Sequence, residues 1–120
     1  LMAKILIVDD SPTHTTTTKK ILIAAGYDVI TAINGNDGIV MAKAEQPDLV
    51  LMDVVMPELN GFQATRKLTQ DPVTKHIPVI LLTTKDQQTD RVWGERQGAK
   101  DYLVKPPTQA PLIAAIEALL

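Results

Sequence analysis

The sequence predicts an α/β fold: a doubly wound, five-stranded parallel sheet in the order 2-1-3-4-5, flanked by five helices. Five short apolar runs recur along its 120 residues, and the segments between them are long enough for helices. Four of the runs are continuous rather than alternating, which is typical of strands buried on both faces of a parallel sheet. Strands that alternate with helices form right-handed β-α-β units, and five such strands suit this doubly wound order.

The predicted strands differ in their polarity. The second, at 27–32, alternates apolar with polar residues and is therefore expected at an edge of the sheet. The other four are rich in Val, Ile and Leu, and they occupy 5–8, 49–52, 79–82 and 102–104.

The first connecting segment carries mixed helix signals. Pro12 suits a first helical turn, and Gly26 is a typical residue at a helix C-terminus. Four consecutive threonines at 15–18 are β-branched and poor helix formers. A helix is still expected, because Ile21 and Leu22 supply an apolar face.

The other four helices are predicted between the remaining strands. Three are expected at 34–45, 62–70 and 86–97, and the last follows Thr108 as its N-cap. Val92 and Trp93 are the only large apolar residues of 86–97, so burial stabilises this helix little. It should therefore lie at the low-stability end of the fold.

Composition and charge exclude several classes of function. A net charge of −2 leaves no basic surface for a phosphate backbone, and four aromatic side chains are too few to stack bases. We therefore expect no nucleic-acid partner. The absence of cysteine excludes disulfides, cysteine zinc sites and thiol catalysis. No run of about 18 apolar residues is present, so we expect no membrane span.

The chain is expected to be one domain, residues 2–120. Leu1 precedes Met2 and is interpreted as a remnant ahead of the natural start. No effector segment follows the last predicted helix, so we expect output through protein contacts unless the sequence is part of a longer protein.

Polar side chains follow the central strands at the point where each strand ends. A single aspartate there is most often a turn or helix cap, but these residues should converge, because the carboxyl ends of parallel strands share one edge. They are Asp9 and Asp10, Asp53, Thr83 and Thr84, and Lys105.

This residue set indicates phosphoryl transfer. Three clustered carboxylates repel one another unless a cation lies among them, and oxygen ligands without His or Cys suit Mg²⁺. With Lys105 and a hydroxyl, they would receive a tetrahedral dianion. We assign the paired Asp9 and Asp10 to metal binding. Asp53, alone on the central strand, is assigned as the nucleophile that forms an aspartyl phosphate.

The motifs resemble those of the response-regulator receiver domain, the CheY-like, flavodoxin-like fold. Their spacing and order agree along essentially the whole chain. The matching motifs are Ile7-Val8-Asp9-Asp10-Ser11, Leu51-Met52-Asp53-Val54-Val55-Met56-Pro57 with Asn60-Gly61, Ile77-Pro78-Val79-Ile80-Leu81-Leu82-Thr83-Thr84, and Gly98-Ala99-Lys100-Asp101-Tyr102-Leu103-Val104-Lys105-Pro106.

The resemblance implies a role for each matching position. Asp53 is the implied phosphoacceptor and a metal ligand, Asp10 and the Val55 carbonyl are direct Mg²⁺ ligands, and Asp9 acts through water. A histidine kinase is the implied phosphodonor, and the domain is not a turnover enzyme.

Further implied roles concern the switch that follows phosphorylation. Lys105 pairs with the phosphoryl oxygens, the Thr83 hydroxyl turns inward, and Tyr102 changes rotamer with it. The backbone at Val55 and Thr84 contacts the phosphoryl group. The peptide bond after Lys105 is similar to one that is usually cis in the family.

A narrower likeness concerns segments 61–66 and 84–99, which resemble single-domain regulators of twitching motility in the type IV pilus chemosensory system. It implies a cytoplasmic, monomeric protein with a chemosensory kinase and a downstream target that the sequence does not identify. The threonines at 15–18 depart from this subfamily, which usually places bulky apolar residues at some of these positions.

Two alternatives remain open. A phosphatase with an aspartyl nucleophile needs a second acid, commonly two residues further on, where this chain has Val55. A degenerate receiver that acts only as a binding module would need no acidic set. His14 and His76 lie in polar segments, and neither is expected to take part in chemistry.

Overall fold

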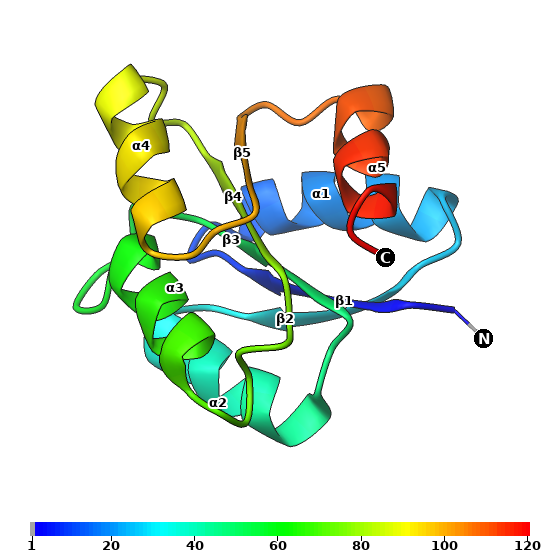
Figure 1. The fold of residues 1–120 in the computed structure, drawn as a ribbon. Coiled ribbons are helices and arrows are strands. Elements are labelled where there is room, and N and C mark those ends of the chain that lie inside the picture. Colours follow the sequence, from blue (N-terminus) through cyan, green and yellow to red (C-terminus); the bar gives the residue numbers. More distant parts are fainter. Residues whose placement is uncertain (1) are drawn as a thin grey trace.

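The computed structural model describes residues 2–120 and confirms the predicted α/β architecture (Figure 1). All strands are parallel, in the order β2-β1-β3-β4-β5. Leu1 lies outside the described residues, so its interpretation as a remnant stays a prediction. The strands are β1 (Lys4–Val8), β2 (Asp28–Ala32), β3 (Leu49–Met52), β4 (Val79–Thr83) and β5 (Asp101–Val104).

Five helices cover the two faces of this sheet. In Figure 1, α1 and α5 lie on one face, and α2, α3 and α4 lie on the other. Thr108 occupies the N-cap position of α5 as predicted, although its hydroxyl caps no backbone N–H. The helices are α1 (Pro12–Ala24), α2 (Gly35–Glu45), α3 (Gly61–Gln70), α4 (Gln88–Arg96) and α5 (Gln109–Glu117).

The core consists of two apolar layers, one on each face. Alternate residues of a strand point to opposite faces, so β1 supplies Ile5 and Ile7 to one layer and Leu6 and Val8 to the other. The layer between the sheet and α1 and α5 contains Leu22, Leu49, Leu51, Ile80, Leu112 and Ile116. The layer on the other face contains Val50, Met52, Phe62, Ala64, Leu68, Val79 and Leu81. This packing fixes the strand ends that carry the polar residues.

The two outer strands test whether the apolar pattern of a run predicts how its strand is buried. Strand β2 lies at an edge, as its alternation predicted. Strand β5 lies at the other edge, as the predicted order requires, but the expectation that the run at 102–104 is buried on both faces was wrong: Tyr102 is buried, whereas Leu103 and Val104 are only half-buried. A run of three apolar residues is too short to indicate how deeply its strand is buried.

The threonine run does not interrupt α1. Thr18 is buried beneath the helix, and the Thr17 hydroxyl donates to the Thr13 carbonyl oxygen one turn earlier, at 3.1 Å. Ser11 caps the first turn, since its side chain accepts from the His14 N–H. Gly26, at φ +92°, then turns the chain towards β2.

Helix α4 is attached to the sheet by little apolar surface. Its two large apolar residues, Val92 and Trp93, are 40% and 50% exposed. Gly94 is buried instead, and a Cβ there would lie 2.5 Å from Leu81 Cδ1. The glycine therefore permits the helix to approach β4 closely.

Within residues 2–120, no helix combines the length and apolar character needed to cross a bilayer.

Candidate functional site

The strand ends bring three carboxylates together. Oxygens of Asp9, Asp10 and Asp53 lie within 4.8 Å of one another, and we call these residues the acidic cluster. Backbone bonds extend the sheet into the cluster: the Asp53 N–H donates to the Val8 carbonyl oxygen at 2.9 Å. Gly61 packs directly behind, where a Cβ would lie 1.9 Å from the Asp53 carbonyl oxygen. Only glycine fits this close approach.

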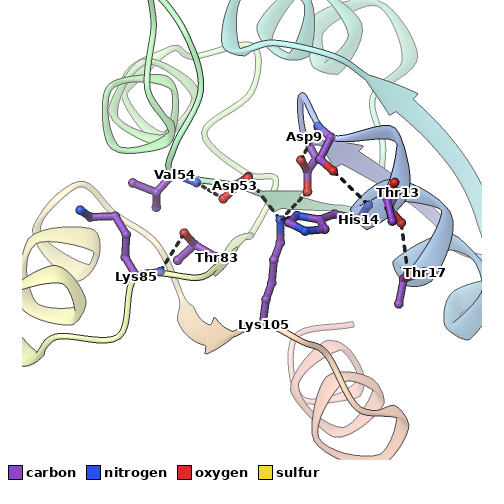
Figure 2. A network of polar contacts seen from close by, with 10 residues as sticks. Asp9, Thr13, His14, Thr17, Asp53, Val54, Thr83, Lys85 and Lys105 are labelled. Atoms are coloured by element: carbon purple, nitrogen blue, oxygen red, sulfur yellow. Dashed lines mark hydrogen bonds and ion pairs between the residues drawn. The ribbon is translucent and has the colours of Figure 1, made fainter.

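Lys105 provides the positive charge of the site (Figure 2). Its Nζ donates to Asp9 Oδ2 at 2.6 Å and to Asp53 Oδ2 at 3.2 Å, and its side chain is only 5% exposed. The Lys105 N–H donates to the Thr83 carbonyl oxygen at 2.8 Å, which fixes its backbone beside the end of β4. The Lys105–Pro106 peptide is cis, as the resemblance implied.

The remaining carboxylate oxygens differ in their partners. Asp9 Oδ1 accepts from the Ser11 N–H at 2.9 Å, and Asp53 Oδ1 accepts from the Val54 N–H at 2.7 Å. The Asp10 side chain is exposed, and within residues 2–120 it forms no hydrogen bond or ion pair. Asp10 therefore keeps its lone pairs available to a ligand from solvent.

The electrostatics favour a further cation. Burial raises the pKa of Asp53; Lys105 opposes this effect, the Asp9 charge adds to it, and the Val54 N–H opposes it. One ammonium thus faces three carboxylates. The cluster offers only oxygen donors, which is the ligand chemistry that Mg²⁺ prefers, so these residues could hold such an ion.

Thr83 and Tyr102 both bond to the backbone of Lys85. The buried Thr83 Oγ1 accepts from the Lys85 N–H at 3.3 Å, and the Tyr102 hydroxyl donates to the Lys85 carbonyl oxygen at 2.8 Å. The loop that leads into α4 therefore links the end of β4 to β5. Figure 2 shows Thr83 on the α4 side of Lys105.

Arg91 of α4 covers the Tyr102 ring. Its guanidinium carbon lies 5.2 Å from the ring centroid, and its Nη1 donates to the Tyr102 carbonyl oxygen at 3.2 Å. Burial, with a smaller contribution from Asp90, raises the pKa of Tyr102 to about 12. The ring is thus held inward, as a neutral phenol.

The predicted site residues fall into two groups. Asp9 and Asp53 both contact Lys105, and Asp10 lies beside them, with one oxygen of each of the three carboxylates within 4.8 Å of the others. Thr83 ends the neighbouring strand, but its hydroxyl bonds to the Lys85 backbone rather than to the cluster. The others surround these residues: Tyr102 under α4, Val55 exposed just after β3, and Thr84 exposed beside Lys105 in a cavity of about 200 Å³.

Sequence reasoning missed His14. Its Nδ1 lies 2.9 Å from Lys105 Nζ, although no chemical role was expected for either histidine. A signal was present: His14 lies in the first turn of the helix that starts directly behind Asp10, at the same edge of the sheet.

Comparison with known proteins identifies the class. Residues 5–117 match the family model of the response regulator receiver domain, and the chain belongs to this family. The structure agrees: chemotaxis protein CheY4 of Vibrio cholerae superposes with a TM-score of 0.92 at 32% identity, covering 100% of both chains.

Three curated relatives show which kind of receiver protein the chain resembles over its whole length. The chain is 58% identical to protein PilH of Pseudomonas aeruginosa over 119 residues, covering 99% of this chain and 98% of that protein. It is 36% identical to protein PilG of the same organism, covering 96% and 85% respectively. The chain matches the response regulator PleD of Caulobacter vibrioides at 41% identity but spans only 26% of its length. The predicted likeness to single-domain regulators is therefore confirmed.

Proposed function

We propose that Asp53 accepts a phosphoryl group from the phosphohistidine of a histidine kinase, in a reaction that requires Mg²⁺. The observation that carries this proposal is the contact of the buried Lys105 ammonium with Asp53 in the centre of the acidic cluster. A carboxylate held beside a fixed cation, with further oxygen ligands adjacent, suits a reaction that places a dianion on that carboxylate.

The residues divide the work as follows. An Asp53 carboxylate oxygen forms a bond to phosphorus, and the bond between phosphorus and the donor imidazole nitrogen breaks, with its electron pair remaining on that nitrogen. Lys105 pairs with a phosphoryl oxygen. Asp10, Asp53 and the Val55 carbonyl would hold Mg²⁺, with Asp9 acting through water; the ion supplies charge neutralisation at the phosphoryl oxygens.

We further propose a role in the chemosensory control of type IV pilus twitching motility. The 58% identity to PilH over nearly the full length of both chains supports it. A chemosensory kinase would be the donor, and the output would be a contact with a target protein. A net charge of −2 supports a protein rather than a nucleic-acid partner. A cytoplasmic, monomeric state is part of the same proposal.

The rival phosphatase is not favoured. Its second acid would be expected two residues after Asp53, but Val55 is apolar and 58% exposed there. A degenerate receiver is also disfavoured, because the complete acidic cluster and Lys105 are assembled.

Labelling tests the phosphoacceptor. Incubation with acetyl phosphate and Mg²⁺ should add one phosphoryl group by intact-mass spectrometry, and the label should disappear with a chelator or in Asp53→Asn. Asp28→Asn, which changes an exposed aspartate at the start of β2, is the matched control and should be labelled normally. Undiminished labelling of Asp53→Asn would refute the assignment. Transfer from the purified kinases of one genome would then identify the donor.

The output surface is proposed at α4, the loop before it and β5. The Lys85 backbone joins Thr83 to Tyr102, so a Thr83 hydroxyl that turns towards a phosphoryl group must release the Lys85 N–H. Helix α4 buries little apolar surface, which suits a segment that changes conformation. Hydrogen exchange with the phosphate mimic beryllofluoride should alter protection first at 83–97 and near Tyr102. A response confined to distant amides would contradict this placement.

A further inference from the structure

The Lys105 ammonium has a third partner outside the acidic cluster. An ammonium carries three N–H donors and no acceptor. Two of these donors are directed to Asp9 Oδ2 at 2.6 Å and Asp53 Oδ2 at 3.2 Å, and His14 Nδ1 lies 2.9 Å from the same Nζ. The three contacts therefore use the full donor capacity of a side chain that is 5% exposed.

A hydrogen bond between these two nitrogens is possible with only one arrangement of hydrogens on His14. Because the ammonium can only donate, His14 Nδ1 must accept and cannot carry a hydrogen. The imidazole is then neutral, with its hydrogen on Nε2. A protonated ring would place N–H against N–H and lose the contact. His14 thus contacts Lys105 as a neutral acceptor, unlike the two carboxylates.

The backbone of α1 holds His14 in position through a closed set of bonds. The Ser11 N–H donates to Asp9 Oδ1 at 2.9 Å, and the His14 N–H donates to Ser11 Oγ at 3.2 Å. The imidazole then contacts Lys105, and Lys105 donates back to Asp9 (Figure 2). The N-cap of α1 and the ammonium are therefore connected through both oxygens of one carboxylate.

We propose that His14 is a positioning residue for Lys105. Asp9 and His14 together hold two of the ammonium's donors, so that the third is directed at Asp53 and at the phosphoryl group attached there. This role rests on the proposed function; the contact itself does not. When Asp53 becomes an acyl phosphate, the third donor passes to a phosphoryl oxygen while the other two contacts persist.

The space beside Lys105 explains why a second fixed contact matters. A cavity of about 200 Å³ lies there, lined by His14, Thr17, Thr84, Pro106 and Pro107 as well as Lys105. Without an acceptor at position 14, the ammonium can rotate about its Asp9 bond towards this cavity. Lys105 would then spend less time directed at Asp53.

The test compares two substitutions that differ in hydrogen bonding. His14→Leu removes the acceptor, whereas His14→Asn restores an acceptor oxygen near the position of Nδ1. His76→Leu, at the other exposed histidine, is the matched control. Two measurements are made on every protein: the Lys105 ammonium signal by nitrogen-15 NMR, and the rate of Asp53 phosphorylation by acetyl phosphate with Mg²⁺. The His14 tautomer is measured by nitrogen-15 NMR in the wild type and in His76→Leu, which keep the imidazole.

The expected results are specific. The wild type should show the Nε2–H tautomer and an ordered Lys105 signal, and His14→Asn should keep that signal while His14→Leu broadens it. Phosphorylation should slow about three- to tenfold in His14→Leu, the value expected for one net hydrogen bond, and recover in His14→Asn. His76→Leu should match the wild type.

Three outcomes would overturn the proposal: a hydrogen on His14 Nδ1, a His14→Leu variant that matches the wild type, or a loss that His14→Asn does not restore. Failure of the wild type itself to take phosphate would instead refute the proposed function. The NMR comparison would then still decide whether His14 holds Lys105, because it requires no phosphorylation.

Discussion

Replacing Lys105 with methionine should destabilise the fold while leaving it folded. The change keeps much of the unbranched side chain and removes the ammonium, with its charge and its hydrogen-bond donors. At an effective dielectric constant near 20, the ammonium's attractions to Asp9 at 2.6 Å and Asp53 at 3.2 Å are about 6 and 5 kcal/mol. Desolvation offsets most of this energy, and loss of one partner of a buried pair typically costs about 3–5 kcal/mol.

Mg²⁺ should reverse much of this loss. The variant leaves three carboxylates without a cation, so it should bind Mg²⁺ at least as tightly as the wild type. At a concentration 100 times Kd, binding adds about 2.7 kcal/mol to the free energy of unfolding. Urea unfolding of both proteins, with and without Mg²⁺, measures each quantity. Equal stability without Mg²⁺, or weaker Mg²⁺ stabilisation of the variant, would refute the reasoning.

Three further predictions concern Gly94, Tyr102 and Asp53. Gly94→Ala should lower the free energy of unfolding by up to about 2 kcal/mol, because its Cβ would lie 2.5 Å from Leu81 Cδ1 and overpacking offsets the gain of about 1 kcal/mol in helix propensity. A stabilised variant would contradict this contact. Tyr102 should ionise at about pH 12 by absorbance, and Tyr102→Phe should remove that step. Since the folded pKa of Tyr102 is raised from 10.0, its contribution to stability is present below about pH 10 and declines up to about pH 12. The folded pKa of Asp53 is also raised, so its ionisation destabilises the fold as pH rises through that pKa. In metal-free buffer at pH 7, Asp53→Asn should therefore unfold at a higher urea concentration than the wild type. A lower urea midpoint for this variant would show that the buried charge of Asp53 does not destabilise the fold.

The sheet and most of the site could be predicted because both depend on strand ends. Continuous apolar runs located β1, β3, β4 and β5 closely, and the residue after each run lies at the carboxyl edge of a parallel sheet. Asp9, Asp53 and Lys105 therefore could be brought together from sequence position alone. Their mutual contact needs no information about side-chain packing beyond that edge.

It was harder to predict which side of each helix packs on the sheet, because more than one side can carry apolar or small residues. In α4 the sequence offered Val92 and Trp93 as the apolar face, yet both are largely exposed and Gly94 lies on the sheet. A glycine within a helix lowers its intrinsic stability, but here the lack of a side chain permits close packing on Leu81. Composition alone does not distinguish these two uses of glycine, because the distance between helix and sheet decides.

His14 is a site residue that could not be predicted from the strand ends. The rule locates residues that follow strands, whereas His14 reaches the site from a helix, one turn beyond its N-cap. Its contact also depends on Ser11 capping that turn and on Lys105 arriving from a strand 91 residues later. A charged lysine has three donors, so two carboxylates at the strand ends leave one donor unassigned. Counting the donors of each buried cation, and then searching the first turns of the helices at the same edge for acceptors, would have pointed to this residue from the sequence.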